Sequence, residues 1–210
     1  MIRILIADDH EVVLHGLRDI LTTRLGDVMV EMTCSAGKAT QLLTKQDWDL
    51  VLLDINMPGR SGLEVLEEAR RVRPQTPVLV LTTYPEEQFA VRAFKLGAAG
   101  YITKNEATEQ LVTAVKWVLT GRKYVTASVA EKLASTLGNP DEQAPHEALS
   151  LRELQVLRLV AIGKSLKEIA ADLVLSEKTV ATYRSRIAEK TGLRTRVELA
   201  RYALKQGLVN

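Results

Sequence analysis

Short apolar runs alternate with amphipathic stretches over the first half of the chain. Five of the runs have the length of a strand rather than of a helix, and they cover residues 2–7, 28–32, 50–53, 78–81 and 99–102. Three other stretches repeat apolar residues at helical spacing: Val13, Leu17, Ile20, Leu21 and Leu25; Leu63, Leu66, Ala69 and Val72; and Leu111, Val112, Val115, Val118 and Leu119. Strands that are apolar throughout are buried on both faces. The pattern therefore predicts an α/β domain with a doubly wound, five-stranded parallel sheet.

The alternation ends near residue 121, and only helical patterns follow it. A short helix is predicted over 127–137, and the turn-forming and acidic residues of 138–145 are typical of a linker. Three capping boxes each open a later helix: Ser150 with Glu153, Ser165 with Glu168, and Thr195 with Glu198. Ser176 can cap another helix, and glycines stand where three of these helices should end: Gly163, Gly192 and Gly207. The sequence thus predicts a second, small all-α domain of four helices.

The composition also indicates the cellular compartment. The 210 residues are 46% hydrophobic and 26% charged, as expected of a folded globular protein. Cys34 is the only cysteine, which excludes a disulfide within one chain and suits a reducing compartment such as the cytoplasm. No apolar run approaches the roughly 18 residues that a membrane helix needs, and the first run stops at Asp8. We therefore expect neither secretion nor membrane insertion.

The charge is unevenly distributed along the chain. Residues 1–125 carry a net charge of −1, residues 126–145 of −2 and residues 146–210 of +5. A basic C-terminal third suits a polyanionic partner, although solvated helices often carry the same excess. Charge alone leaves both interpretations open.

Polar residues follow the predicted strands at the edge where parallel sheets bind ligands. Four strand ends contribute to this group: Asp8 and Asp9, Asp54, Thr82, and Thr103 with Lys104. A single aspartate at a strand end is commonly a helix N-cap, but three gathered carboxylates need a cation such as Mg²⁺. One of them can attack phosphorus, while Lys104 and Thr82 stabilise the phosphoryl oxygens. The sequence therefore predicts a magnesium and phosphoryl site.

The motifs I-L-I-A-D-D-H, L-L-D-I-N-M-P-G-R-S-G, L-T-T and G-A-A-G-Y-I-T-K resemble the receiver domain of bacterial two-component response regulators. The resemblance covers residues 1 to about 122 and implies a flavodoxin-like fold. It implies that Asp54 accepts a phosphoryl group from a sensor histidine kinase. By the same resemblance, the Mg²⁺ site consists of Asp8, Asp9, Asp54 and the backbone carbonyl of Asn56, with Asp8 acting through water. The only catalysis implied is magnesium-dependent autophosphorylation and autodephosphorylation at Asp54.

The resemblance also assigns a switch to this domain. Thr82 moves toward the phosphoryl oxygens, Tyr101 swings inward behind it, and Lys104 pairs with the phosphoryl group. The phosphoryl oxygens give Thr82 and Lys104 hydrogen-bonding partners in the phosphorylated state only. Such a difference between two states shifts the population toward one of them. Asn105 stands where receivers often have a proline, so the sequence leaves open whether the peptide after Lys104 is cis. We expect His10, at a helix start, to be a solvated side chain.

Two helical runs, 166–173 and 177–190, have the short connection of a helix-turn-helix. The second run is basic and carries hydrogen-bonding side chains suited to phosphates or base edges: Lys178, Thr179, Thr182, Tyr183, Arg184, Ser185, Arg186 and Lys190. Val180 and Ile187 are expected to face the core instead. An ordinary solvated bundle helix has a similar composition, so the residues alone leave that alternative open.

The stretch from L-S-L-R-E-L to K-T-V-A-T-Y-R resembles the helix-turn-helix of quorum-sensing regulators over residues 148–208. Together with a receiver, it resembles the NarL/FixJ type of transcriptional regulator. This resemblance implies that Lys167 contacts a phosphate and that the major groove is faced by Lys178, Thr179, Ala181, Thr182, Arg184 and Ser185. The chain departs from the common pattern at Leu166, Ala181 and Tyr183, where asparagine, lysine and histidine are usual.

We therefore predict a receiver over 1–122, a linker with a short helix over 123–147, and a DNA-binding domain over 148–210. The expected function is a phosphorylation-switched transcription factor in the bacterial cytoplasm. Its expected partners are a sensor histidine kinase, double-stranded DNA, a second copy of the chain when phosphorylated, and RNA polymerase as a further candidate. By resemblance, the helix over 195–206 is the dimer surface of the DNA-binding domain.

Two alternatives stay open at this point. One is a DNA-binding regulator that works unphosphorylated. The other is a magnesium-dependent phosphohydrolase of the haloacid dehalogenase type, which also uses an aspartate nucleophile. That class needs a second acid two residues after the nucleophile, and Asn56 stands there. The sequence therefore argues against the hydrolase.

Overall fold

The computed structural model describes residues 1–58, 61–138 and 144–209. The chain divides into two compact units, Met1–Asn139 and Pro140–Asn210. Residues 139–143 of the predicted linker lie outside the described residues. Within the described ranges, no helix is long and apolar enough to cross a membrane.

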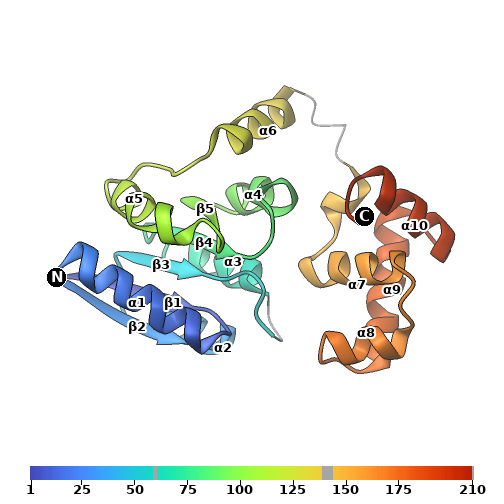
Figure 1. Ribbon diagram of the computed structural model, residues 1–210, viewed down its shortest axis with the longest axis horizontal. Coiled ribbons are helices and arrows are strands. Elements are labelled where there is room, and N and C mark those ends of the chain that lie inside the picture. Colours follow the sequence, from blue (N-terminus) through green and yellow to red (C-terminus); the bar gives the residue numbers. More distant parts are fainter. Residues whose placement is uncertain (59–60, 139–143, 210) are drawn as a thin grey trace. The chain divides into compact units, whose positions relative to one another are not determined.

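The first unit contains the predicted five-stranded parallel sheet, in the order β2-β1-β3-β4-β5 (Figure 1). Its strands are β1 (Ile2–Ala7), β2 (Val28–Thr33), β3 (Leu50–Leu53), β4 (Val78–Thr82) and β5 (Gly100–Thr103). The fold prediction is confirmed. β4 and β5 each extend one residue beyond the predicted end, because Thr82 and Thr103 still pair with each other.

Five helices connect and cover the strands: α1 (Glu11–Leu25), α2 (Ala36–Lys45), α3 (Gly62–Val72), α4 (Glu86–Lys95) and α5 (Ala107–Leu119). The apolar stripes of α1, α3 and α5 were predicted. α2 and α4 were not, and their buried positions include alanines, among them Ala39 and Ala90. Alanine buries little area and gives a weak periodic signal.

Side chains of each strand alternate between two apolar layers. Ile4 and Ile6 of β1 belong to a core cluster that also contains residues of α1 and α5. Leu5 points to the opposite face, because successive residues of a strand alternate, and it is also fully buried. Both faces are therefore covered, and the carboxyl ends of β1, β3, β4 and β5 meet at one edge of the sheet.

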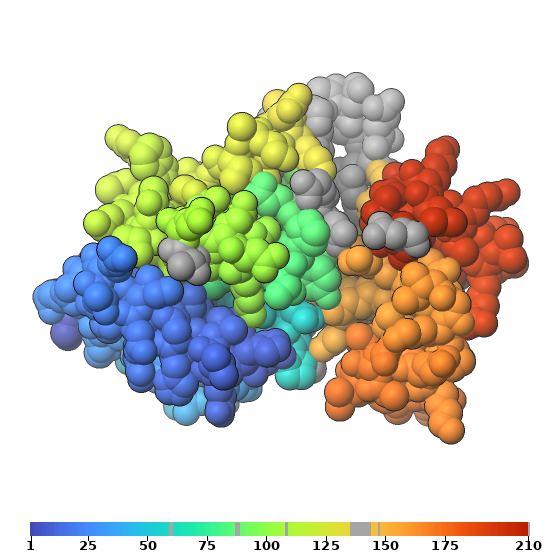
Figure 2. Space-filling view, viewed as in Figure 1, coloured from blue at the N-terminus to red at the C-terminus, as the bar shows by residue number. Residues whose placement is uncertain are grey.

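A sixth helix, α6 (Ala127–Gly138), belongs to the first unit and packs on α4 (Figures 1 and 2). In Figure 2 it is the yellow surface above the green of α4. The segment before it is also attached, because Tyr124 forms a parallel bridge with Gly100 of β5. Thr126 donates a hydrogen bond to Glu86, the first residue of α4 (Oγ1 to Oε2, 2.7 Å). The helix that the sequence placed in a linker is thus held by the sheet edge and by α4.

In its described residues, 144–209, the second unit is all-helical, as predicted. It consists of a 3₁₀ turn, η1 (Pro145–Ala148), and the helices α7 (Leu151–Ala161), α8 (Leu166–Asp172), α9 (Glu177–Thr191) and α10 (Arg196–Lys205). All three predicted capping boxes are formed, and Ser176 caps α9. Gly163, Gly192 and Gly207 have positive φ angles at or just after helix ends. All peptide bonds of the described residues are trans, including the one after Lys104.

Glu153 joins α7 to α9 from a buried position. It is 1% exposed, and its Oε2 accepts hydrogen bonds from the Ser150 backbone N–H (2.6 Å) and from Lys190 Nζ (2.7 Å). Burial alone would raise the pKa of this carboxyl group, but the bonds from Lys190 and Ser150 outweigh it, so the pKa is lowered. The ionised form of Glu153 is therefore preferred in the folded state.

We expect a pH-dependent contribution of Glu153 to stability. Because its folded pKa lies below the unfolded value, the contribution is present above the unfolded pKa and is lost as the pH falls through the folded one. Thermal unfolding followed by circular dichroism should show Glu153→Gln melting earlier than wild type at neutral pH, with the gap closing in acid. Glu189→Gln, at an exposed position of α9, is the matched control. A gap that stays constant with pH contradicts the assignment.

Candidate functional site

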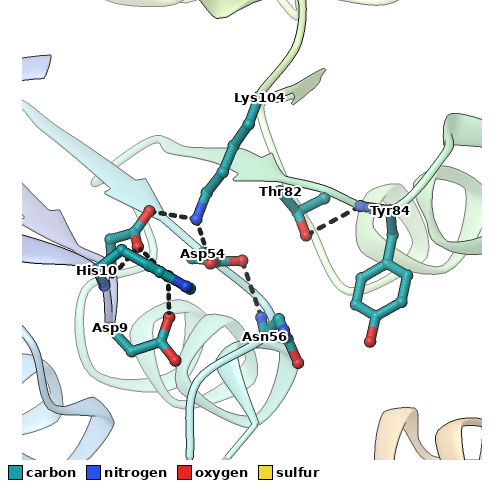
Figure 3. Close-up of polar contacts among 8 residues, drawn as sticks. Asp9, His10, Asp54, Asn56, Thr82, Tyr84 and Lys104 are labelled. Atoms are coloured by element: carbon teal, nitrogen blue, oxygen red, sulfur yellow. Dashed lines mark hydrogen bonds and ion pairs between the residues drawn. The ribbon is translucent and has the colours of Figure 1, made fainter. Parts of the chain in front are cut away.

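Three charged side chains from three strand ends meet at the carboxyl edge of the sheet (Figure 3). Asp8 follows β1, Asp54 follows β3, and Lys104 follows β5. Lys104 Nζ lies 2.6 Å from Asp8 Oδ2 and 2.6 Å from Asp54 Oδ2. Both aspartates are buried, at 1% and 2% exposed. The register of β1 and β3 sets this convergence, because the Asp54 N–H donates to the Ala7 carbonyl oxygen at 2.8 Å.

The ammonium of Lys104 neutralises part of this negative charge. Burial lowers the pKa of Lys104, but hydrogen bonds and charge from Asp54 and Asp8 outweigh that effect, so its pKa is raised. The side chain therefore stays protonated between two carboxylates. The Lys104 ammonium keeps the Asp8 and Asp54 carboxylates in place. Either carboxylate would be costly to bury without this positive charge.

Two buried carboxylate oxygens of the cluster are Asp8 Oδ2 and Asp9 Oδ1. Asp8 Oδ2 meets the Lys104 ammonium at 2.6 Å, and Asp9 Oδ1 meets the His10 ring nitrogen Nδ1 at 2.8 Å. Ligand atoms of Asp8, Asp9, His10 and Asp54 all lie within 4.8 Å of one another. Hard carboxylate oxygens that lie this close together fit a divalent cation.

The Asp54 carboxylate is oriented from two sides. Its Oδ1 accepts a hydrogen bond from the Asn56 backbone N–H at 2.9 Å, and its Oδ2 meets Lys104 (Figure 3). Gly62, the first residue of α3, packs against the backbone at Asp54 and donates its N–H to the Ile55 carbonyl at 3.2 Å. Sequence reasoning did not single out Gly62, whose role depends on this close approach.

Thr82 and Tyr101 both make hydrogen bonds to Tyr84, in the loop after β4. Thr82 is fully buried, and its Oγ1 accepts a hydrogen bond from the Tyr84 N–H at 3.4 Å (Figure 3). Its carbonyl accepts one from the Lys104 N–H at 2.7 Å. Tyr101 is 1% exposed, and its hydroxyl donates to the Tyr84 carbonyl at 3.0 Å. Tyr101 thus occupies an inward position and is tied to this loop.

In the second unit, α9 turns a polar side outward. Val180 and Ile187 are fully buried, as predicted. The residues expected at DNA are exposed or half-buried: Lys178, Thr179, Ala181, Thr182, Arg184 and Ser185 on α9, and Lys167 on α8.

Two shallow depressions flank this outward side of α9. One is lined by Ser176, Lys178, Thr179, Thr182, Tyr183 and Arg186. The other is lined by Leu166, Ala181, Arg184, Ser185, Ala188 and Arg194. Arg194 was not predicted, although a basic residue shortly after the glycine that ends the helix was a usable signal. The surface has the cationic and hydrogen-bonding character that nucleic acids require.

Known proteins match both halves of the chain. The family "Response regulator receiver domain" matches residues 4–116, and "Bacterial regulatory proteins, luxR family" matches residues 147–203. Response regulator GacA of Pseudomonas aeruginosa is 36% identical over 211 aligned positions, covering 100% of this chain and 99% of that protein. Response regulator UvrY of Escherichia coli K12 is 34% identical, covering 100% and 97%. Among solved structures, the RcsB response regulator of Salmonella typhimurium superposes with a TM-score of 0.60 at 27% identity, covering 97% of this chain and 100% of that one.

A doubly wound sheet with an acidic edge, followed by a helix-turn-helix unit, defines a two-component transcription regulator. Its two family matches lie on the two structural units. The chain belongs to the response regulators of the NarL/FixJ type, with a receiver domain and a LuxR-type DNA-binding domain. Members of this family are DNA-binding regulators rather than catalysts.

Proposed function

We propose that Asp54 accepts a phosphoryl group from a sensor histidine kinase and that this modification switches DNA binding by the chain. The observation that carries the proposal is the buried Asp54 carboxylate, held by Lys104 on one oxygen and by the Asn56 N–H on the other. Both oxygens of the acceptor are thereby held in a fixed orientation. The matched response regulators support the same role.

In the proposed reaction, a carboxylate oxygen of Asp54 attacks phosphorus. The bond from phosphorus to the donor breaks, and an acyl phosphate forms. The Lys104 ammonium then pairs with the phosphoryl oxygens, and the Thr82 hydroxyl turns toward them. Mg²⁺, held by Asp8, Asp9, Asp54 and the carbonyl of Asn56, would supply positive charge against the incoming phosphoryl oxygens. Autophosphorylation from small phosphodonors and autodephosphorylation are the only catalysis proposed.

The proposed signal leaves the site through the loop after β4. Movement of Thr82 disturbs its bond with Tyr84, to which Tyr101 is also tied. The loop leads directly into α4. The first residue of α4, Glu86, accepts a hydrogen bond from Thr126, which lies just before α6. A change at the acidic site can therefore reach the segment that leads to the DNA-binding unit. The domains proposed are a receiver over 1–122, a connecting segment over 123–147 and a DNA-binding domain over 148–210.

For the second unit, we propose binding to double-stranded DNA through α9, as a homodimer. A related structure is described as two RcsB dimers bound to two parallel DNAs, at 28% identity and a TM-score of 0.57. Two-fold operators match two-fold proteins, and one short helix reads few base pairs. Val197 and Leu204 of α10 are 75% and 58% exposed and stand two helical turns apart. They supply an apolar stripe for the proposed dimer surface. The proposed location is the bacterial cytoplasm.

Lys178 is proposed to contact a DNA phosphate from the first turn of α9, where its side chain is exposed. Replacing it with alanine should weaken binding to all sequences alike and lower the slope of log affinity against log salt by about 1. The measurement is fluorescence anisotropy with a labelled duplex over a range of salt concentrations. Lys116→Ala, which removes the same charge at an exposed position of α5, is the control. An unchanged slope for Lys178→Ala rejects the phosphate contact.

The proposed switch is tested by comparing treated and untreated full-length protein. After acetyl phosphate and Mg²⁺, we expect the protein to sediment as a dimer and to capture a discrete set of promoter fragments from genomic DNA. The Asp54→Asn variant should do neither. Equal capture and equal sedimentation before and after treatment would favour the alternative of a phosphorylation-independent regulator. Turnover of small phosphoesters at many cycles per Asp54 would instead favour the hydrolase.

A further inference from the structure

His10 lies closer to the acidic site than its sequence context suggested. It directly precedes α1 and makes no side-chain cap bond there. Its Nδ1 lies 2.8 Å from Asp9 Oδ1 and 3.3 Å from Asp8 Oδ1. The backbone N–H of His10 also donates to Asp8 Oδ1 at 2.9 Å. The ring is 60% exposed, but its Nδ1 edge faces the carboxylates (Figure 3). The expectation of a purely solvated side chain was wrong for this edge of the ring.

The two oxygens of Asp8 face two different groups. Oδ2 meets the ammonium of Lys104 at 2.6 Å, whereas Oδ1 faces His10, whose Nδ1 lies 3.3 Å away. Lys104 therefore occupies one side of the cluster and leaves the His10 side for a cation. The cation site has a nitrogen donor on its rim as well as oxygens.

The spacing of these donor atoms suits a single ion. Neighbouring ligands of an octahedral ion with bonds of about 2.1 Å lie roughly 3.0 Å apart. The separations from His10 Nδ1 to Asp9 Oδ1 and Asp8 Oδ1 are 2.8 and 3.3 Å, on either side of that value. One ligand atom from each of Asp8, Asp9, His10 and Asp54 fits within a span of 4.8 Å.

We propose that His10 is a nitrogen ligand of the cation site and makes it selective for divalent transition-metal ions over Mg²⁺. Imidazole is a good ligand for ions such as Ni²⁺, whereas Mg²⁺ takes oxygen and keeps its waters. The inference rests on the proposed cation site of the receiver and adds a residue to it. Any carboxylate site prefers Ni²⁺ to Mg²⁺ to some degree. The contribution of His10 is therefore measured as the decrease in the ratio of Ni²⁺ to Mg²⁺ affinity when His10 is replaced.

The test is calorimetric titration of the untagged full-length chain with Mg²⁺ and with Ni²⁺ at one fixed pH. His10→Ala should lower the Ni²⁺ affinity about tenfold or more and leave the Mg²⁺ affinity within about twofold. His10→Gln keeps a hydrogen-bonding group beside Asp9 but lacks the imidazole, and it should behave like His10→Ala. His15→Ala removes an exposed histidine from α1, outside the cluster, and should change neither affinity.

Each other result has a defined meaning. An unchanged Ni²⁺ affinity in His10→Ala overturns the inference, while Mg²⁺ binding by the wild type still supports the cation site itself. Equal losses for both metals, restored by His10→Gln, also overturn it, because His10 would then only position Asp9. A wild-type chain that binds neither metal removes both this inference and the proposed cation site.

Discussion

The Asp54→Asn variant is expected to gain no phosphoryl group after incubation with acetyl phosphate and Mg²⁺, whereas the wild type gains one. Asn offers an amide where the acceptor carboxylate stands, and an amide is not a competent nucleophile toward phosphorus. The two hydrogen-bonding partners of Asp54, Lys104 and the Asn56 N–H, remain in place in the variant. Intact-mass measurement of the full-length chain reports the result directly. The loss should be complete rather than partial.

The matched control for this experiment is Asp47→Asn, since Asp47 lies on the surface and pairs with Arg73 at 2.9 Å. It should be phosphorylated like the wild type. A wild-type sample without Mg²⁺ should gain no mass, because the single charge of Lys104 does not balance the three carboxylates of Asp8, Asp9 and Asp54, and the excess negative charge would repel the phosphodonor. A mass gain retained in Asp54→Asn would move the acceptor to another residue. No gain in any sample would favour the phosphorylation-independent regulator.

Gly62→Ala is expected to be the most damaging single-methyl change in the receiver. A Cβ at this position would lie 2.1 Å from the Asp54 carbonyl oxygen and 2.6 Å from Ile55 Cα. Both atoms belong to the backbone of the segment after β3, so no side-chain rotation relieves the overlap. The variant must shift either α3 or the acceptor loop. We expect a loss of about 3 kcal/mol or more in the free energy of unfolding, with weak phosphorylation of the fraction that folds.

The same substitution elsewhere should have the opposite sign. Gly16 lies on an exposed position inside α1, and a Cβ there would meet nothing within 4 Å. Because alanine loses less backbone entropy in a helix than glycine does, Gly16→Ala should stabilise the fold by about 0.5–1 kcal/mol. Urea unfolding followed by circular dichroism measures both variants. If Gly62→Ala unfolds at the same urea concentration as the wild type, the close packing at Asp54 is wrong.

Residues whose signal is local were predicted well from the sequence. The strands are mostly apolar, and the capping boxes and C-terminal glycines mark helix ends within a few residues. Both signals can be recognised in the sequence before the fold is known. The acidic residues could be grouped because parallel strands place their carboxyl ends at one edge. That rule brought Asp8, Asp54 and Lys104 together before any distance was known.

Signals that depend on packing were missed. α2 and α4 were not singled out, because their buried positions are partly filled by alanine. α6 was predicted as a short helix, but its attachment to α4 was not, because that attachment depends on the bridge between Gly100 and Tyr124 beside β5 and on the hydrogen bond from Thr126 to Glu86. Neither contact joins residues that are neighbours in the sequence.

The amino-acid sequence by itself determined the doubly wound receiver fold, the second helical unit and the residue types that can bind a cation and a phosphoryl group. These follow from the hydrophobic periodicity and from the order of the predicted elements, and both are visible in the linear sequence. Only the tertiary structure decided which oxygen of Asp8 meets Lys104, which edge of His10 faces the carboxylates, and why position 62 must be glycine. Those features depend on distances of a few ångströms between segments far apart in the chain, and such distances exist only once the segments have packed.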